Sequence, residues 1–253
     1  MINGQKVWTT LAHLCAYGII IARTDPDVPK HAGISMFIVP MDAPGVEIRP
    51  IHQIDGGMHF NEIFFTDVRI PRENLLGDLN NGWRMATAML MYERVAIGTG
   101  AAQGIRHDRA DELIAEATRR GLVDRPVLRQ KLMQLWIAET VQSLVSLRTR
   151  AELKAGKTPG PGGSITKLAV TNIAYLARDL SMEIVGASGV AWSEPTDARW
   201  QRMALSSMQA GIAGGTNEIQ RNIIGDRVLG LPRDISVDRG VPFRELKVGT
   251  LGD

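Results

Sequence analysis

The spacing of the apolar residues changes once along this chain of 253 residues, and this change restricts the fold more than any other feature. Up to about residue 77, the apolar residues form short runs that alternate at a period of two or stop at turn formers. These runs cover residues 19–23, 34–39, 46–49 and 62–70. Several short strands at this spacing predict an antiparallel sheet or a small barrel.

After Gly82 the apolar residues follow a helical period instead. Long helices are predicted over residues 83–118 and 126–155, as antiparallel members of a bundle. The apolar stripe of the second helix is Leu128, Leu132, Leu135, Trp136 and Leu144. A third helix ends near Gly186, and shorter ones follow around residues 197–210 and 216–228. Strands followed by helices indicate an α+β fold, with domains at residues 1–80 and 81–253.

Composition excludes several classes of function. The 29 Lys and Arg against 27 Asp and Glu leave a net charge of +2, so no basic surface for nucleic acid is expected. Cys15 is the only cysteine, which excludes an internal disulfide and a zinc cluster, and its apolar neighbours predict a buried structural thiol. No apolar stretch approaches the roughly 18 residues of a membrane helix, and no signal peptide is recognised. We expect a soluble, cytoplasmic protein without a metal site.

Glu93 interrupts an apolar row formed by Met85, Met89 and Ile97. Residues four apart share one face of a helix. Burial of an unpartnered carboxylate is costly and raises its pKa toward neutrality, which suits removal of a weakly acidic carbon-bound proton. Two interpretations remain open on this pattern: a general base, or a carboxylate at the edge of the stripe that pairs with an arginine of a neighbouring helix.

Two glycine clusters flank predicted helices. Residues 211–215 lead into Thr216, a good N-cap, and exposed backbone N–H groups at such a start can hold an anion or a carbonyl oxygen. Residues 186–189 stand at a helix end. The alternative to a binding role is an ordinary helix start for the first cluster and an ordinary C-cap for the second.

Four segments together, in family order and at family spacing, resemble the acyl-CoA dehydrogenase family. They are Asn-Gly-Gln-Lys-Val-Trp-Thr-Thr at residues 3–10, Phe-Phe-Thr-Asp-Val-Arg-Ile-Pro at 64–71, Glu93-Arg94, and Gly-Gly-Thr-Asn-Glu-Ile-Gln-Arg-Asn-Ile-Ile at 214–224. The resemblance implies a partial antiparallel middle β-domain followed by a C-terminal four-helix bundle. The N-terminal helical domain of the family is missing from this sequence.

The resemblance also implies a chemistry. In the family, a base removes the α-proton of an acyl-CoA thioester while the β-hydride passes to N5 of FAD, which gives a trans-2-enoyl-CoA, as in fatty acid β-oxidation. Hydrogen bonds to the thioester oxygen stabilise the developing enolate. An electron-transferring flavoprotein usually reoxidises the flavin, and family members are dimers or tetramers. A homo-oligomer or a heteromer is therefore expected.

The resemblance favours Glu93 as the catalytic base. Many family members place the glutamate directly before the Gly-Thr of the last motif, where this chain has Gly214, which has no side chain. A minority place it on the first C-terminal helix before an arginine, and Tyr92-Glu93-Arg94 matches that arrangement. The other implied roles are flavin binding by Trp8, Thr10, Gly186, Gly189, Thr216 and Glu218, and substrate binding by Arg94, Gly214 and Gly215.

Two departures from the family pattern keep alternatives open. The usual Arg-x-x-Phe-Gly stretch, whose arginine binds the flavin pyrophosphate, has no Phe-Gly pair in residues 119–126, and Glu183 replaces a usual glutamine. One alternative is a catalytically weak or inactive partner subunit of a heteromer. Another is an acyl-CoA oxidase or a nitroalkane-oxidising relative on the same scaffold.

Overall fold

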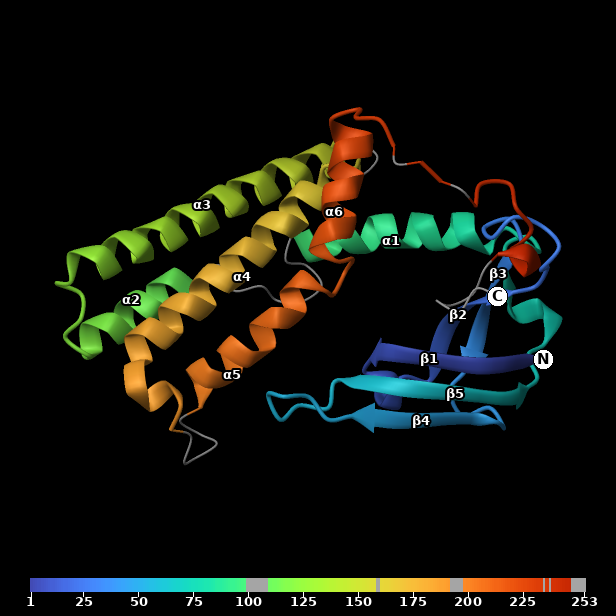
Figure 1. Cartoon of the computed structure of the whole chain (residues 1–253), viewed down its shortest axis with the longest axis horizontal. Helices are drawn as coiled ribbons and strands as arrows, with labels where there is room; N and C mark the ends of the chain where they lie inside the picture. The colour runs from blue at the N-terminus through green and yellow to red at the C-terminus, as the bar shows by residue number, and fades with distance from the viewer. Residues whose placement is uncertain (99–108, 158–159, 192–197, 234, 237, 247–253) are drawn as a thin grey trace. The chain divides into compact units, whose positions relative to one another are not determined.

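The computed structural model describes residues 1–98, 109–157, 160–191, 198–233, 235–236 and 238–246. Their contacts divide the chain into two compact units, coloured by residue number in Figure 1. The first is Met1–Met89 with the C-terminal segment from Asp234, and the second is Leu90–Arg233. The C-terminal segment therefore belongs with the β-rich unit, although the helical unit separates the two in sequence.

The first unit contains two three-stranded antiparallel sheets. One has the order β1 (Ile2–Thr10), β5 (Phe60–Val68) and β4 (Val46–Ile51). The other has the order β2 (Tyr17–Arg23), β3 (Ile34–Pro40) and β6 (Leu75–Leu76). Short 3₁₀ turns at Ala12–Leu14 and Arg72–Asn74 connect strands. All four predicted strands are present, because alternating side chains along them face a common core.

The core of this unit comes from alternate residues of facing strands. Its buried members include Ile20, Val39, Ile63, Phe65 and Val68. Cys15 is exposed, so the prediction of a buried thiol was wrong. It follows a 3₁₀ turn whose N-cap, Leu11, has a positive φ of 54°, and its Sγ donates to the Leu11 carbonyl oxygen at 3.4 Å.

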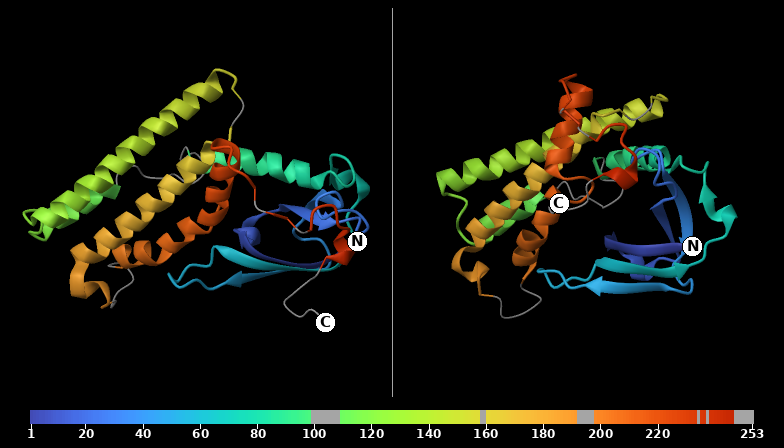
Figure 2. Two further views of the ribbon diagram at one scale, coloured as in Figure 1. Left: turned by 45° about the horizontal axis from the view of Figure 1, so that its top comes forward. Right: turned by 45° about the vertical axis from the view of Figure 1, so that its right-hand side comes forward.

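The second unit is helical. Its long helices are α2 (Arg109–Arg119), α3 (Pro126–Lys154) and α4 (Gly163–Val185), which pack side by side (Figures 1 and 2). Shorter elements complete the chain: η3 (Gly186–Gly189), α5 (Arg199–Ser206), η4 (Ser207–Gly211), α6 (Asn217–Ile223), η5 (Ile224–Val228) and, in the first unit, η6 (Phe243–Glu245). The helix predicted over residues 83–118 appears as α1 (Gly82–Gly98) and α2, and residues 99–108 lie outside the described part.

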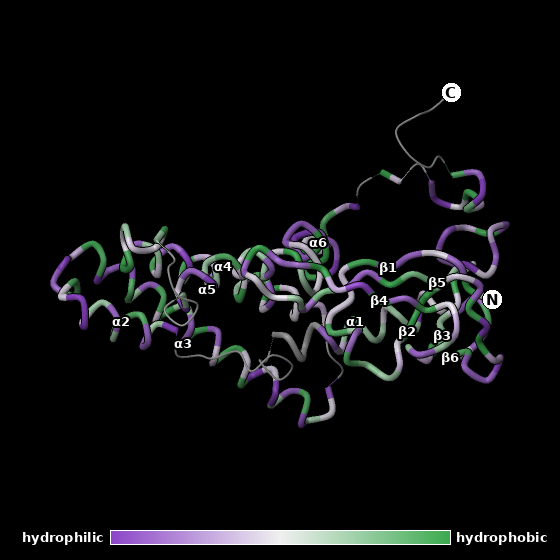
Figure 3. The backbone as a smooth tube through the Cα atoms, turned by 90° about the horizontal axis from the view of Figure 1, so that it is seen from below, coloured by the Kyte–Doolittle hydropathy of each residue, from purple (hydrophilic) through white to green (hydrophobic). Residues whose placement is uncertain are grey.

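Fully buried leucines hold α2, α3 and α4 together. Leu113, Leu132, Leu135 and Leu180 belong to one apolar cluster, and burial of each contributes about 1.5–3 kcal/mol. Apolar and polar residues alternate along these helices, as the hydropathy colours of Figure 3 show. Two residues of the predicted stripe on α3 are exposed: Trp136 at 45% and Leu144 at 60%. The other three residues of that stripe, Leu128, Leu132 and Leu135, are buried.

No helix in the described residues has the length and hydropathy of a membrane-spanning segment. Within the same residues, no group of three or more His, Cys, Asp or Glu side chains is arranged to hold a metal ion.

Candidate active site

The glycine pair before α6 adopts a conformation that suits glycine. Gly214 has φ 65° and Gly215 has φ 90°, both in the left-handed region. Gln220 on α6 is fully buried, and its Nε2 donates hydrogen bonds to the carbonyl oxygens of Gly214 at 2.8 Å and Gly215 at 3.3 Å. A Cβ atom on Gly215 would lie 2.6 Å from that Nε2. The loop therefore passes directly over a buried amide.

Thr216 caps α6, as predicted. Its hydroxyl oxygen accepts a hydrogen bond from the N–H of Ile219 at 3.3 Å. Glu218 lies exposed in the first turn and pairs with Arg221 at 3.3 Å. Hydrogen bonds from its own backbone N–H and from the Thr216 hydroxyl lower the pKa of the Glu218 carboxyl. The two predicted flavin-binding residues of this segment thus share one polar helix start.

Two polar residues of α4 hold the other end of the same loop. Lys167 is 3% exposed, and its Nζ donates to the carbonyl oxygen of Ala210 at 2.8 Å. The Thr171 hydroxyl donates to the same oxygen at 2.7 Å. Burial lowers the pKa of the Lys167 ammonium, opposed by the charge of Glu218. Beside them lies a cavity of about 210 Å³, lined by α4, α5, η4 and Arg109.

Sequence reasoning missed Lys167, Thr171 and Gln220. The available signal was spacing, since Lys167 and Thr171 lie four apart on the buried face of α4, in phase with Ala174. A lysine in phase with buried residues indicates a cation with a protein acceptor. No such spacing identifies Gln220 in the sequence, because its hydrogen-bond partners, Gly214 and Gly215, lie in the preceding loop.

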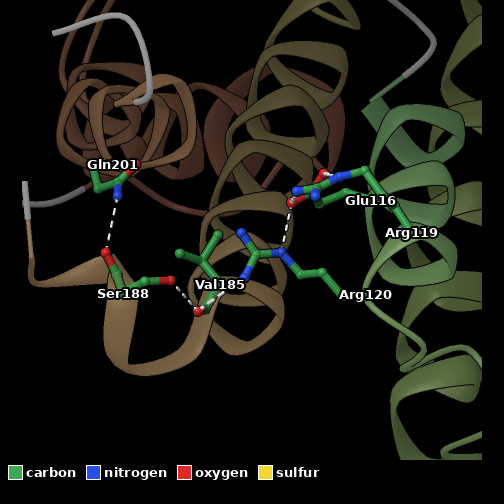
Figure 4. A network of polar contacts seen from close by, with 6 residues as sticks. All are labelled: Glu116, Arg119, Arg120, Val185, Ser188 and Gln201. Carbon is green, nitrogen blue, oxygen red and sulfur yellow. Dashed lines mark hydrogen bonds and ion pairs between the residues drawn. The ribbon is translucent and has the colours of Figure 1, made fainter. Parts of the chain in front are cut away.

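The second predicted glycine cluster ends α4. Gly186 has φ 63°, caps the helix after Val185, and leaves open space where a Cβ would stand. Ser188 donates to the Val185 carbonyl oxygen at 2.8 Å, and Gln201 of α5 donates to the Ser188 carbonyl oxygen at 3.2 Å. Figure 4 shows this network of side chains around the end of the helix. Gly189 is buried in the same turn. The C-cap interpretation is thus confirmed, and it leaves flavin binding by these glycines a prediction.

Two arginines at the end of α2 lie beside this cluster. Arg120 donates to the Val185 carbonyl oxygen at 3.4 Å and pairs with Glu116 at 2.6 Å (Figure 4). Arg119 pairs with the same carboxylate at 2.5 Å and is more exposed. Nearby in the sequence of α4, Glu183 pairs with Lys131 at 2.7 Å. Arg119, Arg120 and Glu183 lie where this chain departs from the family pattern, and each of them forms an ion pair within this chain.

Trp8 occupies an unusual backbone conformation in β1. The register between β1 and β5 shifts between Lys6 and Thr9, and Trp8 has φ 65°. The ring is 63% exposed and meets Phe60 edge to face, with 6.1 Å between centroids. For a bulky residue, a positive φ is a strained exception. The irregularity re-aims the side chain, as bulges do, and Thr10 is exposed two residues later.

Glu93 is exposed on α1 and, within the described residues, has no hydrogen bond or ion pair. Met85 and Met89 on the same row are 36% and 43% exposed. The expectation that this row is buried was wrong at Met85, Met89 and Glu93, which are exposed in the described part of the chain. The alternative pairing with an arginine is also not observed among the described side chains. The side chains of Arg94 and Ile97 lie outside the described residues.

The predicted site residues thus fall into separate groups. Trp8 and Thr10 belong to the first unit, whereas Glu93 and both glycine clusters belong to the second. Within the second unit, the structure brings Gly214, Gly215, Thr216 and Glu218 together around Gln220.

Comparison with known proteins identifies both parts of the chain. Residues 1–68 match the model of the acyl-CoA dehydrogenase middle domain, and residues 80–229 match that of the acyl-CoA dehydrogenase C-terminal domain. Acyl-CoA dehydrogenase IpdE1 of Mycolicibacterium smegmatis is 39% identical over 236 residues, which cover 93% of this chain and 58% of that protein.

Two solved structures are similar in fold. The ChsE4-ChsE5 complex from Mycobacterium tuberculosis gives a TM-score of 0.75 at 31% identity, over 92% of this chain and 61% of that chain. The Tcur3481-Tcur3483 steroid ACAD gives 0.79 at 27% identity, with the same coverage. The chain thus spans about three fifths of the length of these relatives. The matches confirm the resemblance and the predicted fold.

Proposed function

Because the chain belongs to the acyl-CoA dehydrogenase family of flavin-dependent oxidoreductases, we propose that it catalyses the α,β-dehydrogenation of an acyl-CoA thioester with bound FAD. The observation that carries this proposal is the complementary pair of Gly214 and Glu93. The loop position lacks a carboxylate, and the first C-terminal helix supplies one directly before Arg94. The product is a trans-2-enoyl-CoA, consistent with a step of β-oxidation.

The residues present fit FAD. Trp8 offers an exposed aromatic ring and Thr10 an exposed hydroxyl. Gly186 leaves open space at the end of α4, and the start of α6 offers Thr216 and Glu218. When bound, FAD supplies the acceptor for the two electrons of the β-hydride. In our proposal each of these residues would contact it.

In this proposal Glu93 removes the α-proton, and the loop with the glycine pair stabilises the charge that develops on the substrate. Glu93 accepts the α-proton as the electron pair of that C–H bond moves into the new double bond. Negative charge develops on the thioester oxygen, and peptide N–H groups of the Gly214-Gly215 loop stabilise it. Arg94 belongs to the substrate site in this proposal.

The experiment that tests the base is Glu93→Gln in the FAD-loaded protein. Exchange of the substrate α-proton in D2O should fall about 10²–10⁴-fold, while the FAD content stays unchanged. Glu152→Gln is the matched control, since Glu152 lies exposed on α3, a helix that carries none of the proposed site residues. Near-normal exchange in Glu93→Gln contradicts the assignment.

A second candidate function is a partner subunit of a heteromeric dehydrogenase. The exposed apolar side chains of α3, which call for a covering surface, support it; they are Trp136, Ile137, Val141, Leu144 and Leu147. The pairing of Arg119 and Arg120 with Glu116 also supports it, because it occupies the arginines closest to the family's pyrophosphate motif. One structural neighbour is itself a two-protein complex.

An absorbance spectrum with and without added FAD, combined with size-exclusion chromatography, separates the two candidates. A yellow oligomer of this chain alone supports the dehydrogenase, whereas a colourless protein that binds FAD only with a companion chain supports the partner subunit. Because one neighbour is named a steroid ACAD, the acyl-CoA panel should include steroid side-chain thioesters beside linear ones. An electron-transferring flavoprotein is the electron acceptor to supply.

A further inference from the structure

The loop that carries the glycine pair is anchored at both ends by buried side chains. Lys167 and Thr171 hold Ala210, and Gln220 holds Gly214 and Gly215. We infer that Gln220 and Lys167 are positioning residues that set the direction of the peptide N–H groups of this loop toward the thioester oxygen. The inference rests on the dehydrogenase function proposed above and adds two residues to it.

Peptide planarity links an anchored carbonyl to the N–H that follows it. In a trans peptide the C=O of one residue and the N–H of the next point in opposite directions. Both glycine carbonyl oxygens face the buried Nε2 of Gln220, at 2.8 Å and 3.3 Å. The N–H groups of Gly215 and Thr216 therefore point away from Gln220. Neither donates to a group within the described residues.

The backbone conformation of Gly214 and Gly215 suits hydrogen bonding to the Gln220 side chain. Left-handed φ values at Gly214 and Gly215 let two successive carbonyls turn toward one side chain. Gly215 is also so close to Gln220 that a Cβ would displace its amide. A buried amide whose donor is fully used by two carbonyls keeps one rotamer, so the N–H directions are fixed before substrate binds.

Lys167 fixes the opposite end. The Ala210 carbonyl accepts from both Nζ of Lys167 and the hydroxyl of Thr171, which fixes the peptide that leads into Gly211. A Cβ on Gly211 would lie 2.0 Å from the Tyr175 hydroxyl, so the chain lies tightly against α4 there. Hydrogen bonds from an ammonium are roughly twice as strong as neutral ones. Only three residues separate the two anchors, which leaves the loop little freedom.

A test must separate positioning from ordinary stability. Gln220→Met keeps the side-chain volume and removes both donated hydrogen bonds. We expect kcat for α-proton exchange to fall about 10²-fold, the effect of losing one oxyanion donor, with a smaller change in KM. Gln142→Met is the matched control, because Gln142 is a buried glutamine on α3 outside the site. It should lower stability without lowering kcat.

A pH profile gives a readout that a structural role does not produce. In Gln220→Glu, a protonated carboxyl donates one hydrogen bond to the glycine carbonyls, whereas the ionised form repels them. Exchange activity of this variant should therefore fall as pH rises, over a range where the wild type stays level. If Gln220→Met does not fold, Lys167→Met provides the same test, since Thr171 still satisfies Ala210. About tenfold loss of kcat is expected there, within the range for one hydrogen bond.

The outcomes distinguish the two proposals. Wild-type protein with FAD that exchanges no α-proton of any acyl-CoA overturns the dehydrogenase function, and the positioning roles with it. Active wild type with unchanged kcat in a folded Gln220→Met, or in a folded Lys167→Met, overturns the positioning inference alone. A Gln220→Glu profile that parallels the wild type also overturns it.

Discussion

Trp8 is the residue whose replacement most directly separates a structural role from a functional one. Its φ of 65° is unfavourable for a bulky L-residue, at a cost of roughly 1–2 kcal/mol. Asn tolerates this region, so Trp8→Asn relieves most of that strain. It loses the edge-to-face contact with Phe60, worth about 0.5–1.5 kcal/mol. Because the ring is mostly exposed, little burial is lost.

These contributions offset each other. The free energy of unfolding of the FAD-free chain should therefore change by less than about 1 kcal/mol in Trp8→Asn, compared with about 3–5 kcal/mol for truncation of a core tryptophan. Flavin binding should weaken much more. Stacking of a planar heterocycle on an aromatic side chain contributes about 1–3 kcal/mol, which is about 5- to 150-fold in the dissociation constant.

Urea unfolding of the FAD-free protein and titration of FAD fluorescence measure the two effects separately. Trp8→Phe is the matched control, since it keeps an aromatic ring and the same backbone strain, and it should retain most of the flavin affinity. A loss of about 3 kcal/mol or more in the FAD-free Trp8→Asn protein makes Trp8 a structural residue. An unchanged FAD affinity removes Trp8 from the flavin site.

Two further predictions concern the glycine loop and the C-terminal segment. Gly215→Ala should destabilise the protein by about 1–2 kcal/mol in urea unfolding, because its φ of 90° strains any L-residue, and it should lower kcat more than KM because it displaces Gln220. Hydrogen bonds from Lys30 and Ser236 hold the pKa of Asp238 at about 2. A carboxyl with a depressed folded pKa stabilises fully above its ordinary value near 3.8 and loses that effect as pH falls toward 2. Limited proteolysis of the C-terminal segment between pH 5 and about 2 should thus increase at low pH, and Asp238→Asn should remove the pH dependence; cleavage that rises equally in the variant contradicts this account.

The sequence predicted the strands β2, β3, β4 and β5 and the start of α6, because both depend on local rules. Period-two alternation marks a half-buried strand wherever it occurs, and the Thr216 cap needs only a hydroxyl and the N–H of Ile219. Cys15 is exposed after a turn that starts with a left-handed φ at Leu11, and no propensity indicates that conformation. Glu93 illustrates the same limit, since the burial of its row depends on what covers α1.

The buried face of α3 becomes polar in the second half of the helix. Its buried face continues with a helical spacing from Leu128, Leu132 and Leu135 into three polar residues: Glu139, Gln142 and Ser146. Glu139 is buried because it accepts a hydrogen bond from the N–H of Ala110 at 3.0 Å, at the start of α2. The apolar residues of this half, such as Leu144, lie on another face. Hydropathy alone does not predict this polar continuation of the buried face, because a polar residue can be buried where the fold provides its hydrogen-bond partner.

Backbone strain in the first unit also concentrates where the resemblance places the flavin ring. Four described non-glycine residues have positive φ: Trp8, Leu11, Asp67 and Asn80. Asp and Asn tolerate this region because their short polar side chains bond to the local backbone, so the last two need no further explanation. Trp8 and Leu11 do not tolerate it, and they flank the exposed Thr10 at the end of β1. A chain under selection for stability alone would place Gly or Asn at position 8, and the flavin-binding role that we propose for the exposed indole accounts for a Trp there.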